Sequence, residues 1–203
     1  MNKTFKSYLL LVPLIILSVS ALSQASKPVV KGKKYQSQPL VKHIYTADPS
    51  AHVFNGKIYI YPSHDIEAGV AENDNGDHFA MRDYHILSLD KIGGKVTDHG
   101  VALDIKNIPW AGRQLWAPDA AYKNGTYYLY FPVKDKQDIF RIGVATSKSP
   151  TGPFKAAATP IKGSLSIDPA VFTNTDGNHT CILVEFGVGN SNVGNLQNTI
   201  SMV

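Results

Sequence analysis

The stretch of sequence that decides the fold is DPSAHVFNGKIYIY, residues 48–61. An apolar run leads into Asn55-Gly56, and a run of alternating β-branched and aromatic residues follows it. Asn-Gly between two such runs is a strong hairpin signal, because both residues tolerate the positive φ that a two-residue turn needs. The stretch therefore predicts a β-hairpin whose first strand begins beside an Asp-Pro pair, where proline is tolerated.

The same pattern occurs twice more along the chain. Residues 117–130 read APDAAYKNGTYYLY, and residues 168–177 read DPAVFTNTDG. The copies start about 50 to 70 residues apart, which is typical of four-stranded propeller blades that carry loops. No amphipathic helical stretch of useful length is found between them. We therefore predict an all-β chain built as β-propeller blades.

Each copy carries an aspartate at the start of its first strand: Asp48, Asp119 and Asp168. The innermost strand of each blade lines the channel of a propeller. The three carboxylates are therefore expected to converge on a common axis. The alternative is that an Asp-Pro pair merely initiates a turn, and the recurrence in three copies favours convergence.

These copies, in this order and at this spacing, resemble the first three blade signatures of glycoside hydrolase family 43. The resemblance rests on ADPS (47–50), LWAPD (115–119) and SIDPAVF (166–172), with SPTGPF (149–154) between the second and third blades. The family contains β-xylosidases, α-L-arabinofuranosidases and arabinanases. It implies a five-bladed β-propeller, of which residues 41–178 supply about three blades as a partial catalytic domain.

The resemblance also implies an inverting hydrolysis, in which a carboxylate activates water and a carboxylic acid protonates the leaving oxygen. By position in the motifs, Asp48 matches the general base. Asp168 matches the carboxylate that orients the acid and raises its pKa by like-charge proximity. Asp119 matches no catalytic position and is expected to be a structural hydrogen-bonding residue near the channel.

Four further residues are candidates for binding substrate: Trp116, Trp110, His64 and Asp65. An indole can stack on the apolar face of a sugar ring. For Trp110, stacking on sugar and packing inside a blade remain equally good interpretations. His64 and Asp65 begin a long polar insert that runs to Asp83 and resembles a loop of xylosidase-like relatives.

No group of residues has a spacing typical of a metal site, and we expect no cofactor. Some relatives hold a calcium ion in the channel, but its ligands cannot be placed on this sequence. The one cysteine, Cys181, cannot form an internal disulfide.

The first 25 residues are expected to form a signal peptide. Lys3 and Lys6 precede an apolar run from Tyr8 to Leu17, and small residues end at Ala25. Residues 26–40, rich in Lys, Ser, Gln and Pro, are expected to form a linker. The protein is therefore expected to be secreted or periplasmic, with no membrane partner after cleavage. A net charge of +4 gives no reason to invoke nucleic acid.

The sequence departs from the family pattern after Asn178. The family's general acid is a glutamate of the fourth blade, for which Glu185 comes too early. In a frame shifted by one base from His179, wobble bases can be chosen so that the codons give the aromatic strand that the first two copies contain. We therefore expect residues 179–203 to be an out-of-frame tail, and the chain to be a poorly folded, inactive fragment. Coding DNA read past codon 178 tests this expectation, against a natural short form with a different end.

Two functions follow from these observations. The first is hydrolysis of glycosidic bonds in xylan or arabinan oligosaccharides. The alternative is a non-catalytic propeller that binds carbohydrate through the same aromatic side chains and has no need of a general acid.

Overall fold

Two hairpins in the structure have the turns that the sequence predicts. The computed structural model describes residues 38–175, 178–185 and 198–202. Asn55 and Gly56 have φ values of 52° and 76°, and Asn124 and Gly125 have values of 50° and 73°. Both residues of each turn are therefore left-handed, as a two-residue turn between twisted strands requires. The third turn includes residues 176–177, which lie outside the described residues.

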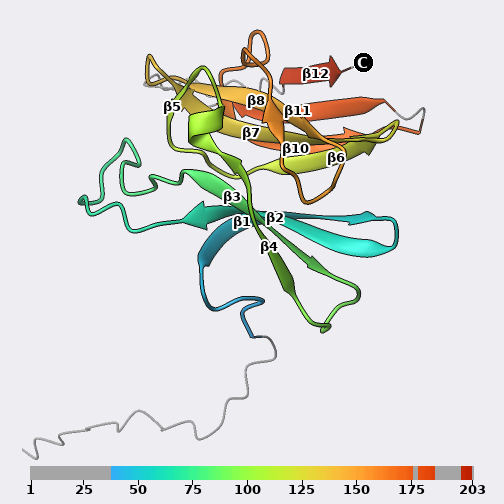
Figure 1. The fold of residues 1–203 in the computed structure, drawn as a ribbon. Helices are drawn as coiled ribbons and strands as arrows, with labels where there is room; N and C mark the ends of the chain where they lie inside the picture. The colour runs from blue at the N-terminus through green and yellow to red at the C-terminus, as the bar shows by residue number, and fades with distance from the viewer. Residues whose placement is uncertain (1–37, 176–177, 186–197, 203) are drawn as a thin grey trace, which may run out of the picture. The chain divides into compact units, whose positions relative to one another are not determined.

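Each hairpin belongs to an antiparallel sheet, and from the hairpin onward each strand pairs with the next one along the chain (Figure 1). The first sheet consists of β1 (Tyr45–Phe54), β2 (Lys57–Asp65), β3 (Asp83–Leu89) and β4 (Thr97–Asp104). The second consists of β5 (Ala111–Arg113), β6 (Asp119–Lys123), β7 (Thr126–Asp135), β8 (Phe140–Ser147) and β9 (Lys155–Ala156). The third consists of β10 (Ser166–Thr173), β11 (His179–Glu185) and β12 (Asn198–Met202).

The first and second sheets have the same plan. In the second sheet β6 pairs with β7, which continues through β8 to β9, while β5 pairs with the far end of β7. A short 3-10 helix, η1 (Ile105–Asn107), is the one helical element in the described ranges. Four strands in meander order make a propeller blade. The prediction of an all-β chain with about three blades is therefore confirmed.

Aromatic and aliphatic side chains fill the space between the first two sheets. Tyr61, Tyr84 and Ile86 from the first sheet pack with Leu129 and Phe131 from the second, and each is fully buried. They come from alternate positions, so one face of each strand enters this core. A smaller cluster joins the second and third sheets through Ile142 and Cys181. Alternation along the strands thus stacks successive sheets face to face.

The innermost strands of the three sheets meet at Asp119, the first residue of β6. Its carboxylate accepts hydrogen bonds from His52 Nε2 on β1 at 2.6 Å and from the Val171 N–H on β10 at 2.6 Å. It also accepts one from the Ala120 N–H at 2.8 Å. Asp119 therefore has the structural hydrogen-bonding position expected from the sequence.

Several predicted segments lie outside the described residues. These are the signal peptide (1–25) and all but the last three residues of the linker (26–40). Within the ranges that the structure describes, no helix is long and apolar enough to cross a membrane. Of the suspected out-of-frame tail, β11 and β12 are described, and β11 pairs with β10 from Thr173↔His179 onward. Pairing of the backbone does not distinguish one reading frame from another, so the frameshift stays a prediction.

Candidate active site

Asp48 and Asp168 occupy equivalent positions on the innermost strands of the first and third sheets. Asp48 has a φ of 45° and Asp168 a φ of 49°. Each precedes a proline, and each lies where the pairing register shifts: between Ala47 and Ser50 on β1, and between residues 167 and 170 on β10. A bulge of this kind redirects a side chain out of the regular alternation.

This backbone geometry separates the two residues from Asp119. A left-handed conformation costs free energy for residues other than glycine, and a following proline restricts the backbone further. Such conformations persist only where the surroundings enforce them, and they cluster at functional sites. Asp119 instead begins β6 in regular register, paired with Tyr130.

The two aspartates line one hollow of about 230 Å³, together with Asp65 at the end of β2. The other lining residues are apolar or aromatic: Ala47, Phe79, Met81, Trp116, Ala117 and Ile167. Three carboxylates from two sheets therefore meet in one pocket with largely apolar walls. Asp65 has one carboxylate oxygen that is buried and has no hydrogen-bond partner within the described residues.

The carboxylates perturb one another. Burial raises the pKa of Asp168 above its usual value, and the neighbouring charge of Asp48 raises it further. Burial and then the charge of Asp48 also raise the pKa of Asp65, against the opposing effect of His64. Asp48 is thus the charge shared by both raised groups. A pocket that raises the pKa of two carboxyl groups beside a third is suited to acid–base chemistry.

Trp116 separates this hollow from a larger one of about 690 Å³, and it lines both. Its Nε1 donates a 2.8 Å hydrogen bond to the Phe79 carbonyl. The centroids of the Trp116 and Phe140 rings are 4.4 Å apart. The polar insert before β3 closes over Trp116, held by a hydrogen bond from Gln114 Nε2 to the Gly76 carbonyl and by an ion pair between Arg113 and Asp77. Trp116 therefore borders the hollow that contains Asp48, and its stacking on sugar stays a prediction.

Trp110 lies elsewhere. It stacks on Phe131 with an interplanar angle of 9°, and its Nε1 donates to the Ala157 carbonyl at 3.3 Å. A Cβ atom added at Gly143 would come within 2.8 Å of its ring. These contacts favour the packing interpretation of Trp110, which lines a different hollow from the one that contains Asp48.

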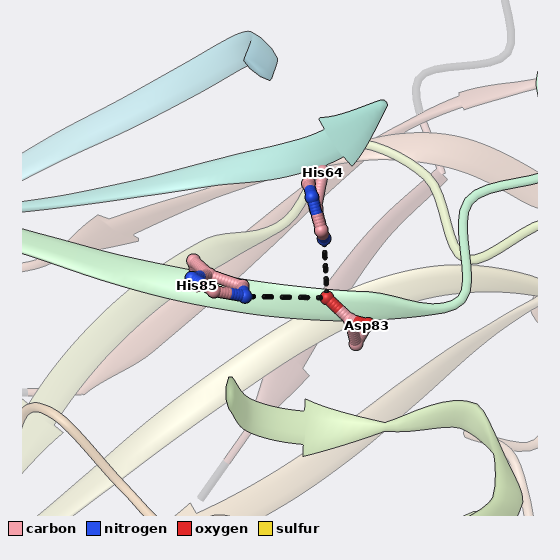
Figure 2. A group of neighbouring side chains, drawn as sticks. All are labelled: His64, Asp83 and His85. Carbon is pink, nitrogen blue, oxygen red and sulfur yellow. Dashed lines mark hydrogen bonds and ion pairs between the residues drawn. The ribbon is translucent and has the colours of Figure 1, made fainter. Parts of the chain in front are cut away.

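His64 does not line the pocket, although its neighbour Asp65 does. Successive side chains point to opposite faces of a strand. The His64 imidazole contacts Asp83 through a 2.6 Å hydrogen bond, with His85 beside them (Figure 2). The sequence showed no metal-ligand spacing here because the three residues come from two strands. It also did not single out Phe79 and Met81, which reach the pocket through the fold of the insert.

Comparison with known proteins identifies a family whose members match most of this chain. The profile described as Glycosyl hydrolases family 43 matches residues 38–193. The chain is 64% identical over 141 residues to a xylosidase/arabinosidase 43A of Humicola insolens, which covers 68% of this chain and 43% of that protein. It is 60% identical over 147 residues to a xylosidase/arabinosidase of Bacteroides ovatus, covering 72% and 45%.

Solved structures show the same similarity. A β-xylosidase/α-arabinofuranosidase from a compost metagenome, determined with xylotriose, superposes with a TM-score of 0.70 at 75% identity, covering 71% of this chain and 44% of that one. A GH43_1 enzyme from Xanthomonas citri, also with xylotriose, gives 0.66 at 53%, covering 72% and 42%. These neighbours are five-bladed propellers. The chain spans less than half the length of the relatives it matches.

Proposed function

This chain belongs to glycosyl hydrolases family 43, and from that membership we propose that its pocket hydrolyses xylosidic or arabinosidic bonds by inversion. The observation that carries the proposal is the pair of left-handed aspartates, Asp48 and Asp168, brought into one hollow from two sheets. Asp119 begins the equivalent strand of the second sheet without this distortion. Packing alone therefore does not require the left-handed backbone, and such strained conformations cluster at functional sites.

Asp48 is assigned as the general base. It borders the hollow beside Asp65 and Asp168, and a carboxylate in such a position can take a proton from a water molecule. Asp168 is the orienting carboxylate. Its raised pKa follows from burial and from Asp48, and the same repulsion would raise the pKa of an acid placed next to it.

Asp65 and Trp116 are assigned to the sugar. A partly buried carboxyl group with one unpartnered oxygen can accept a hydrogen bond from a sugar hydroxyl. The Trp116 ring offers a flat apolar surface at the boundary of the two hollows. The xylotriose bound by two similar structures supports a xylo-oligosaccharide as the substrate.

We also propose that the 203-residue chain is inactive by itself. The described lining of the pocket offers three aspartates and no glutamate to protonate the leaving oxygen. The alternative of a carbohydrate-binding propeller remains, because an aromatic wall beside polar groups suffices for binding. Export through a signal peptide at residues 1–25 is proposed as well, and N-terminal sequencing of the mature protein tests it.

The experiment compares Asp48→Asn with its parent in a protein whose frame is restored after Asn178, using aryl β-xyloside and aryl α-arabinofuranoside. General-base catalysis contributes roughly 10²–10⁴-fold, so kcat should fall by that factor while the affinity for xylotriose changes little. Asp90→Asn, at an exposed surface aspartate, is the matched control. Unchanged turnover in Asp48→Asn would reject the enzyme, and a parent that binds xylotriose without turning over either substrate would establish the binding alternative.

A further inference from the structure

A second group of chemically capable side chains lies on the first sheet, outside the pocket. His64 comes from β2, and Asp83 and His85 come from β3. One ligand atom from each lies within 4.8 Å of the other two. Figure 2 shows the two imidazoles and the carboxylate pointing toward a common point. Their side chains are 17%, 22% and 15% exposed, so the group is screened from water but reachable.

Strand geometry explains why these residues meet. Asp83 and His85 are two positions apart on β3 and share a face. The β2–β3 ladder runs from Ile58↔Leu89 to Ile60↔Leu87, and the same register continued would bring His64 opposite Asp83. The backbone pairing ends at Ile60, so the three side chains bridge two strands that are no longer paired there.

The hydrogen bonds around the group leave lone pairs of His85 and Asp83 facing one another, with the His64 Nδ1–H beside them. A carboxylate only accepts, so the hydrogen of the 2.6 Å bond between His64 Nδ1 and Asp83 Oδ1 is on the imidazole. His85 Nδ1 lies 3.0 Å from Asp98 Oδ1 and donates to it. In the neutral ring Nε2 is then an acceptor, and it faces Asp83 Oδ1 at 3.9 Å, too far for a hydrogen bond.

We propose that His64, Asp83 and His85 bind a divalent first-row transition-metal ion, for which Zn²⁺ is the best match. Two imidazole nitrogens and one carboxylate oxygen are a donor set typical of zinc with an open fourth position. Calcium and magnesium prefer oxygen ligands alone, so the nitrogens disfavour them. On binding, His64 changes tautomer: Nδ1 gives its proton to solvent, Nε2 takes one from solvent, and the neutral ring binds the metal through Nδ1.

The spacing suits a small ion. Metal–ligand bonds of about 2.0–2.2 Å place tetrahedral ligand atoms about 3.4 Å apart. Asp83 Oδ1 lies 2.6 Å from His64 Nδ1 and 3.9 Å from His85 Nε2, and these distances fall on either side of that value. Side-chain rotations of about 1 Å at the ligand atoms therefore suffice, and the strands need not move.

Asp98 on β4 supplies the outer support that metal-binding histidines use. A carboxylate that accepts from the distal ring nitrogen fixes the tautomer and makes the ligating nitrogen more basic. Asp98 does this for His85, and it is held in turn by the Gly100 N–H at 2.8 Å and by His43 Nε2 at 2.7 Å. One of the ligands is thus already oriented for a metal.

The bound ion would hold the end of β2 against β3. The residue after His64 is Asp65, whose carboxylate lines the pocket from the opposite face of the strand. Joining β2 to β3 at His64 therefore limits the movement of the strand end that places Asp65. The site is structural in this proposal and takes no part in the reaction.

The test is titration of the 203-residue chain with Zn²⁺ and with Co²⁺ as a spectroscopic probe. We expect one ion per chain, a visible cobalt band of low coordination number, and a rise of roughly 5 °C in Tm at excess Zn²⁺. His64→Ala and His85→Ala should each lower the affinity at least tenfold, and Asp98→Ala about tenfold. His78→Ala removes an imidazole elsewhere and should leave the affinity unchanged.

Three results would overturn the proposal. One is absence of binding to the parent chain. Another is equal affinity in His64→Ala and the parent. The third is a loss in His78→Ala as large as the loss in His85→Ala, which would mean scattered surface binding. The cobalt band of each variant is read separately from its Tm, so a variant of lower stability still reports whether the ion is bound.

Discussion

His52 on β1 and Asp119 on β6 are joined by a 2.6 Å hydrogen bond between the imidazole Nε2 and the carboxylate. The second oxygen of that carboxylate accepts the backbone N–H of Val171 on β10 at 2.6 Å. One buried carboxylate therefore ties the innermost strands of three sheets that are otherwise joined by apolar packing. This arrangement explains why an aspartate recurs in the second repeat although it lies outside the hollow that Asp48 and Asp168 line.

Replacing Asp119 should destabilise the whole fold. In Asp119→Ala the buried Ala120 N–H and the partly buried Val171 N–H lose their acceptor, and unsatisfied buried groups cost about 1–3 kcal/mol each. We expect the free energy of unfolding to fall by roughly 2–4 kcal/mol in urea denaturation. Asp90→Ala, at an aspartate whose side chain is 88% exposed, should change it by less than about 0.5 kcal/mol. Equal effects of the two substitutions would contradict the role assigned to Asp119.

The two tryptophans should respond differently to truncation. Trp110→Ala leaves a cavity beside Phe131, and such core losses cost about 3–5 kcal/mol. Its affinity for xylotriose should be unchanged where the protein stays folded. Trp116→Ala should weaken xylotriose binding about tenfold or more, because stacking area is lost. Isothermal calorimetry with matched melting curves distinguishes the two, and a binding loss confined to Trp110→Ala would reverse the assignment.

The repeat made most of this fold predictable. Asn-Gly turns and alternating aromatic strands are local signals, and they gave the hairpins of residues 48–61 and 117–130 their correct turns. The strand order then follows from the short connections. The aspartates at the start of each hairpin also identified the innermost strands.

Other features depend on distant contacts that no local pattern encodes. Trp110 and Trp116 are chemically alike, and only the packing of Phe131 and Phe140 separates their roles. The left-handed backbone of Asp48 was not expected, because an Asp-Pro pair is compatible with an ordinary turn. His64 was assigned to the pocket with Asp65, yet neighbours on a strand face opposite ways. Because of that alternation, His64 contacts Asp83 and does not line the pocket.

Apolar side chains exposed on the third sheet should make the isolated chain associate. Phe172 is 60% exposed and Ile182 is 42% exposed, and the register Phe172↔Thr180 and Ala170↔Ile182 puts them on one face. Phe172→Thr keeps a good strand former and removes the apolar ring. We expect less light scattering and less dye binding at equal concentration with little change in Tm. Phe154→Thr, in the core, is the contrasting variant and should unfold the chain.

Asp168→Asn should raise stability at neutral pH. Burial and the charge of Asp48 raise the pKa of Asp168 in the folded state, so the folded protein binds this proton more tightly than the unfolded chain does. The stabilisation from that proton is complete below the unfolded pKa of about 3.9 and is lost as pH rises through the folded value. At pH 7 the ionised group therefore opposes folding. Asparagine cannot ionise, and it tolerates the left-handed backbone that Asp168 adopts.

The expected result is a Tm for Asp168→Asn about 1–3 °C above the parent at pH 7, with the difference shrinking toward zero as the pH falls below about 4. Melting curves between these limits measure it, and Asp90→Asn should show no such trend. A constant difference at all pH values would mean that packing, and not charge, separates the variants. A lower Tm for Asp168→Asn at pH 7 would mean that the Asp168 charge is stabilised by a partner, and the pocket would then lack the strain expected of a catalytic carboxylate pair.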